Sequence, residues 1–150
     1  MTSTANLQRR KLLAGGIAAV ASPAFATPDE MAAAIGAFTA GVAPKAGRVK
    51  LDVATLVDNG NAVPVSVAVD SPMTAADHVT AIAIFNERNP QTDVVKFSLG
   101  PRAGKAHVST RIRMATSQKL TAVARMSDGS FWSGSADVIV TLAACIEGEL

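Results

Sequence analysis

The sequence has one cysteine, two histidines, one tryptophan and no tyrosine among 150 residues. An internal disulfide needs two cysteines, so the chain cannot cross-link itself. Neither His78 nor His107 has a second histidine or a cysteine at metal-ligand spacing, and we expect neither to bind a metal. Motifs for a nucleophile elbow, a phosphate loop and a covalent haem site are also missing. The sequence therefore predicts a protein that is not an enzyme and has no cofactor of its own.

The first 26 residues differ from the rest. Three basic residues, Arg9, Arg10 and Lys11, precede the apolar run LLAGGIAAVA and then the tripeptide AFA, which ends at Ala26. This order is typical of a cleaved secretory signal, and the run is shorter than the roughly 20 residues that span a bilayer. The paired arginines favour the twin-arginine route. We therefore expect residues 1–26 to be removed and the mature protein to be periplasmic.

The mature chain would be nearly neutral. The expected signal contains three of the fourteen basic residues and none of the twelve acidic ones, which leaves a net charge of −1. Nucleic acids and anionic membrane surfaces select for a strong excess of positive charge. Neither is therefore expected as a partner.

Residues 27–47 are expected to form a short helix and a linker. Pro28 suits a first helical turn, the acidic Asp29 and Glu30 favour the positive helix N-terminus, and Gly41 or Pro44 would end the helix. Apolar residues at helical spacing predict one stripe that packs on the rest of the protein: Met31, Ile35 and Phe38.

Residues 48–142 change to a period of two, which predicts strands. The clearest segments are VPVSVAVD, KAHVSTRIR and DVIVTL, and turn signals such as DNGN, GPRAG and SDGS separate them from weaker candidates. About seven strands are expected, and no second helix intervenes. The pattern predicts an all-β fold, an immunoglobulin-like antiparallel β-sandwich preceded by the short helix. The side chains expected to face its core are Val63, Val65, Val67, Val69, Ala106, Val108, Thr110, Ile112, Val138, Val140 and Leu142.

Four further expectations concern single positions. Pro64 indicates an edge strand or a strand that starts there, because proline donates no ladder hydrogen bond. His107 is expected on the solvated face of its strand, and Phe131 and Trp132 are expected to pack at the end of the sandwich after a hairpin turn. The segment DSPMT, around Pro72 and Met73, is expected either to contact a partner or to pack as an ordinary turn.

The single cysteine, Cys145, follows the last predicted strand, in a C-terminal arm of residues 143–150. An extended span of three residues reaches about 10 Å, so a thiol there can enter another protein's cavity while the sandwich stays outside. Glu147, Glu149 and the terminal carboxylate are expected to raise the pKa of the thiol. A thiol that is not activated by its neighbours suits a carrier better than a catalytic nucleophile.

Four stretches carry a resemblance to a known family. NGNAVPVSVAVDSPMT, STRIRMATSQ, MSDGSFW and VIVTL-x-x-C resemble SoxY, the sulfur-carrying subunit of the periplasmic Sox thiosulfate-oxidation system. The resemblance runs from about Arg48 to Cys145. It implies an immunoglobulin-like sandwich paired with SoxZ, a second small β-sandwich, and a cysteine that bears the substrate covalently. By position that residue is Cys145.

The resemblance also implies transient partners. In the family, a haem-containing Sox cytochrome couples thiosulfate to the cysteine, a manganese-dependent hydrolase releases sulfate, and a molybdenum-containing dehydrogenase oxidises the remaining sulfur. A subunit without a signal would be exported as part of the folded complex.

The arm departs from the family, whose cysteine is flanked by glycine pairs. Here Ala143 and Ala144 precede it, and Ile146 and Glu147 follow it. Three explanations stand: a divergent carrier with adapted partners, a paralogue that carries another sulfur compound, or an arm that has decayed. The rival function is an exported β-sandwich that only binds a protein partner, with Cys145 incidental or in an intermolecular disulfide. A small-molecule binding sandwich has no identifiable pocket residues.

Overall fold

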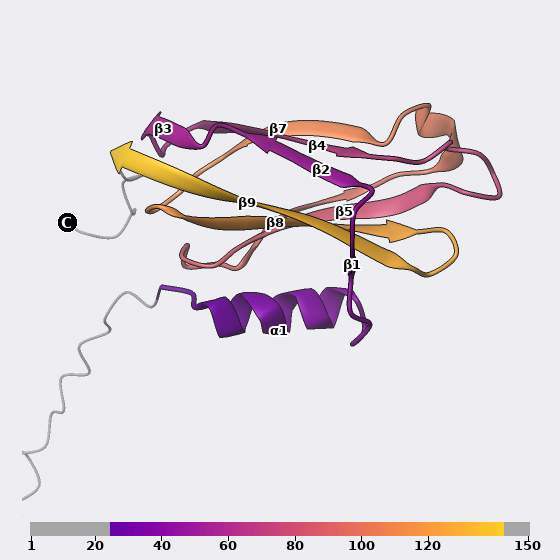
Figure 1. Ribbon diagram of the computed structural model, residues 1–150, viewed down its shortest axis with the longest axis horizontal. Coiled ribbons are helices and arrows are strands. Elements are labelled where there is room, and N and C mark those ends of the chain that lie inside the picture. The colour runs from indigo at the N-terminus through magenta and orange to yellow at the C-terminus, as the bar shows by residue number, and fades with distance from the viewer. Residues whose placement is uncertain (1–24, 143–150) are drawn as a thin grey trace, which may run out of the picture.

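A computed structural model describes residues 25–142 in three layers: one helix, a six-stranded sheet and a three-stranded sheet (Figure 1). The elements in chain order are α1 (Pro28–Phe38), β1 (Lys45–Ala46), β2 (Val49–Val53), β3 (Leu56–Asn59), β4 (Val63–Val69), β5 (Val79–Asn86), β6 (Asp93–Ser98), the 3₁₀ turn η1 (Pro101–Ala103), β7 (His107–Ile112), β8 (Gln118–Met126) and β9 (Phe131–Leu142). The expected β-sandwich with a preceding helix is confirmed.

The larger sheet has the order β1-β9-β8-β5-β6, and β3 pairs with the far part of β9. The smaller sheet has the order β2-β4-β7. Most pairs are antiparallel as expected, but β1 and β3 both run parallel to β9. The chain leaves the larger sheet after β1, crosses to the smaller one as β2, and returns as β3. This crossing closes one side of the sandwich.

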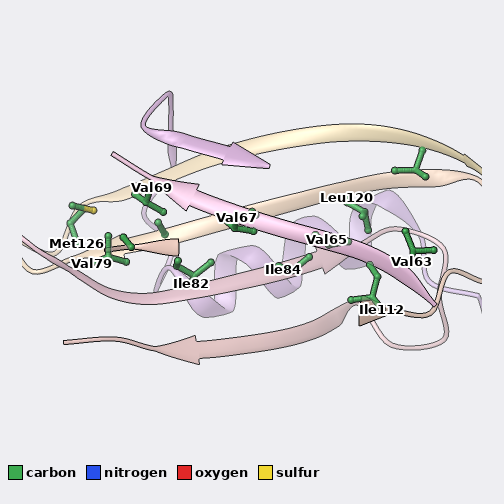
Figure 2. Packing of buried hydrophobic residues seen from close by; sticks show 14 of the residues in the cluster. Val63, Val65, Val67, Val69, Val79, Ile82, Ile84, Ile112, Leu120 and Met126 are labelled. Carbon is green, nitrogen blue, oxygen red and sulfur yellow. The ribbon is translucent and has the colours of Figure 1, made fainter. Parts of the chain in front are cut away.

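Alternating side chains of the strands fill the space between the sheets, as expected from the period of two. Figure 2 shows this cluster, in which the four valines of β4 join Ile82 and Ile84 of β5 and Leu120 of β8. Ala106, Ile112 and Val138 are buried, and Val108 and Val140 are half-buried, as predicted. Leu142 was predicted to be in the core, and this is wrong: it is 66% exposed, because β9 continues past the end of the core.

The expectation that Pro64 marks an edge strand is wrong for the strand as a whole, because β4 is the middle strand of its sheet. The strand does begin at Val63, one residue before the proline. The last residue of β2, Val53, pairs with Val65. Pro64 therefore has a strand neighbour on the β7 side only, through its pairing with Arg111, and its missing N–H interrupts no complete ladder.

Helix α1 lies on the outer face of the larger sheet (Figure 1). Thr27 caps it with a reciprocal capping box, in which the Thr27 N–H donates to Glu30 (2.8 Å) and the Glu30 N–H donates to the Thr27 hydroxyl. The predicted stripe packs as expected: Met31, Ile35 and Phe38 contact a second cluster that includes Phe85 and Phe131. Phe38 meets both phenylalanine rings edge-on at 5.9 Å.

Strand β9 passes close to β2 at Gly134. A Cβ at this position would collide with the backbone carbonyl oxygen of Val49. Glycine therefore allows the longest strand of the larger sheet to lie against the first strand of the smaller one. The side of the sandwich that the crossing closes depends on this contact.

The β8–β9 hairpin turns at Ser127–Ser130, where Gly129 has a φ of 82°. The Ser130 N–H and hydroxyl both donate to the Asp128 carboxylate, and these hydrogen bonds lower the pKa of that carboxyl. After the turn, Phe131 faces the helix and Trp132 faces the core cluster, with Lys45 and Arg48 over the indole ring. Next to this turn Phe131 is buried and Trp132 is half-buried, so both aromatic residues pack as expected.

Candidate functional site

The candidate site is the root of the C-terminal arm. Cys145 and the rest of residues 143–150 lie outside the described residues, as do residues 1–24 of the expected signal. The last described residue is Leu142, where β9 ends. Covalent geometry alone limits the Cys145 Cα to about 10 Å from the Cα of Leu142. The residues around Leu142 are therefore the described residues from which the arm with Cys145 starts.

One edge of β9 is held by β3 and the residues beside it. The Ile139 N–H donates to the carbonyl oxygen of Thr55 (2.8 Å), and the Gly60 N–H donates to the carbonyl oxygen of Leu142 (2.8 Å). Between them, the Thr141 hydroxyl donates to the carbonyl oxygen of Asp58 (3.0 Å). The last four residues of β9 are thus tied down along their whole length on this side.

The other edge of β9 is held by a side chain. Pairing with β8 stops at Gln118, which is opposite Val138. Beyond that point the Val140 N–H donates to the Ser117 hydroxyl at 2.9 Å, and the same hydroxyl is 3.4 Å from the Val140 carbonyl oxygen. Ser117 therefore replaces one residue of the β8 ladder and extends the two-sided support of β9 toward the arm.

The loop that contains Ser117 is itself fixed. The Asn89 amide oxygen accepts hydrogen bonds from the Ala115 N–H (3.0 Å) and from the Gln118 side chain (2.8 Å). The Asn89 side-chain NH₂ donates to the carbonyl oxygen of Arg113, and the Gln118 oxygen accepts from the Arg88 N–H. Two loops, one after β5 and one after β7, are joined in this way beneath the end of β9.

Replacing Ser117 with alanine is expected to loosen the end of β9 without unfolding the sandwich. The Val140 N–H loses its partner, and one hydrogen bond is worth about 1 kcal/mol. We expect amide hydrogen exchange at Val140 to become about fivefold faster. Ser109→Ala is the matched control, because Ser109 bonds only Ser66 on the outer face of the smaller sheet. Equal exchange at Val140 in both variants would contradict the supporting role of Ser117.

The loop after β7 lies next to the end of β9. The Met114 N–H donates to the carbonyl oxygen of Gly60, whose own N–H bonds Leu142. Arg113 precedes Met114 and is exposed. Gly60 therefore joins the end of β9 to the loop after β7 through backbone hydrogen bonds.

The histidines have structural or surface positions. His107 is exposed at the start of β7, as expected, and its backbone pairs with Ala68. The His78 ring nitrogen Nδ1 is 3.0 Å from the carbonyl oxygen of Thr74, and its backbone N–H donates to Ser127. Between residues 25 and 142, no three His, Cys, Asp or Glu side chains converge as a metal site would require.

The DSPMT segment packs as an ordinary turn at Met73. Met73 is 6% exposed, has a φ of 53° and joins the core cluster, and its sulfur lies 3.4 Å from the Val79 N–H. Its side chain is therefore not available at the surface. Pro72 is exposed.

Large apolar side chains are exposed around the arm root. Leu56 is 60% exposed, Ile139 is 54% exposed and Leu142 is 66% exposed. The alternation patterns did not predict Leu56 at all, because the four-residue β3 was missed. A signal for it was present only in the apolar pair Leu56-Val57 directly before the DNGN turn. Ser117 was also missed, because nothing local distinguishes it from any other loop serine.

Helix α1 is too short to cross a bilayer, and no other described segment forms a helix that could do so. Comparison with curated proteins finds no match. Comparison with solved structures gives SoxY, the sulfur carrier protein from Chlorobium limicola f thiosulfatophilum, with 30% identity and a TM-score of 0.63. The match covers 76% of this chain and 98% of that one.

Superoxide reductases have a similar fold. The enzyme from Ignicoccus hospitalis is 16% identical with a TM-score of 0.57, over 77% of this chain and 94% of that one. The superoxide reductase from Nanoarchaeum equitans is 10% identical with a TM-score of 0.55, over 64% and 100%. At these identities the likeness concerns the fold alone.

The family comparison is more specific. The family described as "Sulfur oxidation protein SoxY" matches residues 34–145, which include the C-terminal part of α1, every strand and Cys145 as the last matched residue. This range is about three quarters of the chain, and it agrees with the structural likeness to the Chlorobium carrier. The protein therefore belongs to the SoxY family of sulfur oxidation proteins.

Proposed function

We propose that this protein holds sulfur-oxidation intermediates covalently on Cys145 and presents them to partner enzymes in the periplasm. One observation carries the proposal: the SoxY family match extends through the arm and ends at Cys145, the only cysteine in the chain. The hydrogen bonds on both sides of β9 support it, because they hold the residue from which the arm starts.

The loading step proposed for Cys145 is an oxidative coupling. The thiol and thiosulfate form a sulfur–sulfur bond, which gives Cys–S–S–SO₃⁻ and releases one proton and two electrons. In the family the electrons go to a haem-containing Sox cytochrome. Water then cleaves the terminal sulfur–sulfur bond, which releases hydrogen sulfate and leaves Cys–S–SH. Both steps need groups that the partner enzymes supply, and this chain supplies the thiol.

The proposed partners follow from family membership. A SoxZ-like small β-sandwich would pair with the protein stably. The Sox cytochrome, the sulfate-releasing hydrolase and the sulfur dehydrogenase would bind transiently. Export through the twin-arginine route remains a prediction from Arg9 and Arg10. That route carries folded proteins, so the subunits would leave the cytoplasm already assembled.

The proposal is tested by loading the purified protein in vitro. The mature protein, paired with its SoxZ-like subunit, is incubated with thiosulfate and the oxidised Sox cytochrome encoded in the same genome. We expect the peptide that contains Cys145 to gain the mass of one thiosulfate, and a reductant to remove it. An unmodified thiol after reduction of the cytochrome by thiosulfate would favour the alternative, a sandwich that only binds a protein partner.

Restoring glycines to the arm is expected to separate the explanations for its unusual sequence. A variant with Ala144→Gly and Ile146→Gly gains backbone freedom and loses the β-branched side chain beside the sulfur. If this protein's own enzymes have adapted to the arm, the variant is loaded more slowly by them and faster by a cytochrome from a system with a glycine-flanked carrier. We therefore expect the protein's own cytochrome to load the variant more slowly than the wild type, and the other cytochrome to load it faster. Faster loading by both cytochromes would contradict adaptation and support a decayed arm.

A further inference from the structure

The sequence contains the cleavage pattern of the expected signal twice. The tripeptide A-x-A, followed by a hydroxyl residue and a proline, occurs at residues 24–28 as AFATP and at residues 19–23 as AVASP. A signal peptidase recognises small side chains at the first and third positions of the tripeptide, and both copies supply alanine there. The pattern therefore fits a cut after Ala21 as well as the expected cut after Ala26.

The residue before the second bond, Ala26, belongs to the folded domain. It is 7% exposed, and its N–H donates to the carbonyl oxygen of Asn89 at 3.1 Å. Phe25 precedes it and lines a surface hollow together with Arg88 and Thr116. Both packing and a backbone hydrogen bond therefore hold the chain on the amino side of the Ala26–Thr27 bond.

The residues after the second bond form the start of α1. The Thr27 N–H donates to the Glu30 carboxylate at 2.8 Å, and the Thr27 hydroxyl accepts from the Glu30 N–H. The Thr27 carbonyl oxygen accepts from the Met31 N–H at 3.0 Å, and Pro28 is the first helical residue. The Ala26–Thr27 bond therefore has folded structure on both sides.

A peptidase needs the opposite condition around the bond that it cuts. Proteases cut where the backbone is exposed and free of internal hydrogen bonds, because they bind it as an extended strand through main-chain hydrogen bonds of their own. The proposed twin-arginine route delivers a chain that has already folded. A cut after Ala26 would then require Ala26 to leave Asn89 and α1 to lose its first turn.

The first copy of the pattern avoids this requirement. Ala21 lies five residues before Ala26 in the sequence. Five residues of extended chain span about 17 Å, so a peptidase can reach the Ala21–Ser22 bond while Ala26 stays bonded to Asn89.

We propose that the signal is cut after Ala21 and that the mature protein begins at Ser22. The inference rests on the proposed export of a folded chain, and it identifies the bond at which that export ends. Residues 22–26 then remain in the mature protein, and Ala26 keeps its hydrogen bond to Asn89. The Asn89 side chain also accepts hydrogen bonds from Ala115 and Gln118, in the loops beneath the end of β9. The retained residues therefore belong to the same network that supports the strand before the arm.

The test is the intact mass and N-terminal sequence of the protein purified from cells that express the full 150-residue chain from its own genome. We expect a mature form that begins at Ser22. A mature form that begins at Thr27 would overturn the inference and leave the proposed export intact. A chain that still contains Arg9 and Arg10 would overturn both.

A matched pair of variants tests the choice of bond independently. Ala19→Leu and Ala24→Leu each replace the first alanine of one copy of the pattern with a side chain too large for the peptidase. We expect Ala19→Leu to slow conversion of the precursor at least about tenfold in a pulse-chase experiment. Ala24→Leu should be processed at the wild-type rate, and its mature form should contain the added mass of the substitution. The reverse result, in which only Ala24→Leu slows processing, would overturn the inference.

The role of the retained residues is tested by melting. A chain of residues 22–150 keeps the buried Ala26 and its hydrogen bond, and a chain of residues 27–150 lacks both. We expect the longer chain to melt about 4 °C higher. Equal melting temperatures would show that Ala26 is not held by the fold, and would overturn the inference.

Discussion

Replacing Cys145 with serine is expected to abolish thiosulfate-dependent growth while leaving the sandwich folded. Serine has nearly the same size as cysteine, but its oxygen cannot form a disulfide-type bond to a sulfur substrate. Because Cys145 is the only cysteine, no other residue can take the cargo. We expect thiosulfate oxidation by cells that contain only the serine variant to fall to the level of a deletion strain.

Two controls distinguish the loss of the Cys145 thiol from an effect of the substitution on folding. The variant should keep the wild-type melting temperature, because Cys145 lies beyond the last core residue of β9, Val140. It should also copurify with the SoxZ-like subunit, which contacts the sandwich in the proposed complex. Normal thiosulfate oxidation by a variant that folds and pairs would show that the thiol is incidental and that the protein acts only as a binding module.

Replacing Gly134 with alanine is expected to cause a large loss of stability. The new Cβ would meet the Val49 carbonyl oxygen, a backbone atom that can move only if β2 moves. Overpacking of this kind costs about 3 kcal/mol. For a domain of this size we expect a fall of roughly 10 °C in melting temperature.

Gly36→Ala is the matched control. A Cβ at Gly36 meets no atom within 4 Å, and the residue lies inside helix α1. Alanine in a helix interior is favoured over glycine by about 0.5–1 kcal/mol, so this variant should be slightly more stable than the wild type. Similar melting temperatures for Gly134→Ala and the wild type would show that the crossing between β2 and β9 is looser than the structure describes.

The sequence predicted those parts of the fold in which local pattern and final environment agree. The burial of the β4 valines and of alternate residues in β7 was predicted correctly, because side chains of a strand with one face on the core point inward at every second residue. The helix was predicted correctly from Pro28, the acidic Asp29 and Glu30, and the stripe that begins at Met31. Neither inference needed knowledge of which strands become neighbours.

Prediction from the sequence failed where the conformation or burial of a residue depends on segments that are distant in the sequence. Strands β1 and β3 contain two and four residues, which are too few to show an alternating pattern in the sequence. They form because both pair with β9, which is distant from them in the sequence. Leu142 follows the alternation of Val138 and Val140, but no opposing sheet lies over it. The support of β9 by Ser117 joins residues 23 positions apart, which no local pattern encodes.

The central claim concerns Cys145, and the most direct measurement is the intact mass of the protein isolated from cells. The protein is purified without reductant from thiosulfate-grown cells, and its mass is compared before and after reduction. The account predicts a population with sulfur-containing adducts on Cys145 that a reductant returns to the free thiol. A single unmodified mass in cells that are actively oxidising thiosulfate would contradict it.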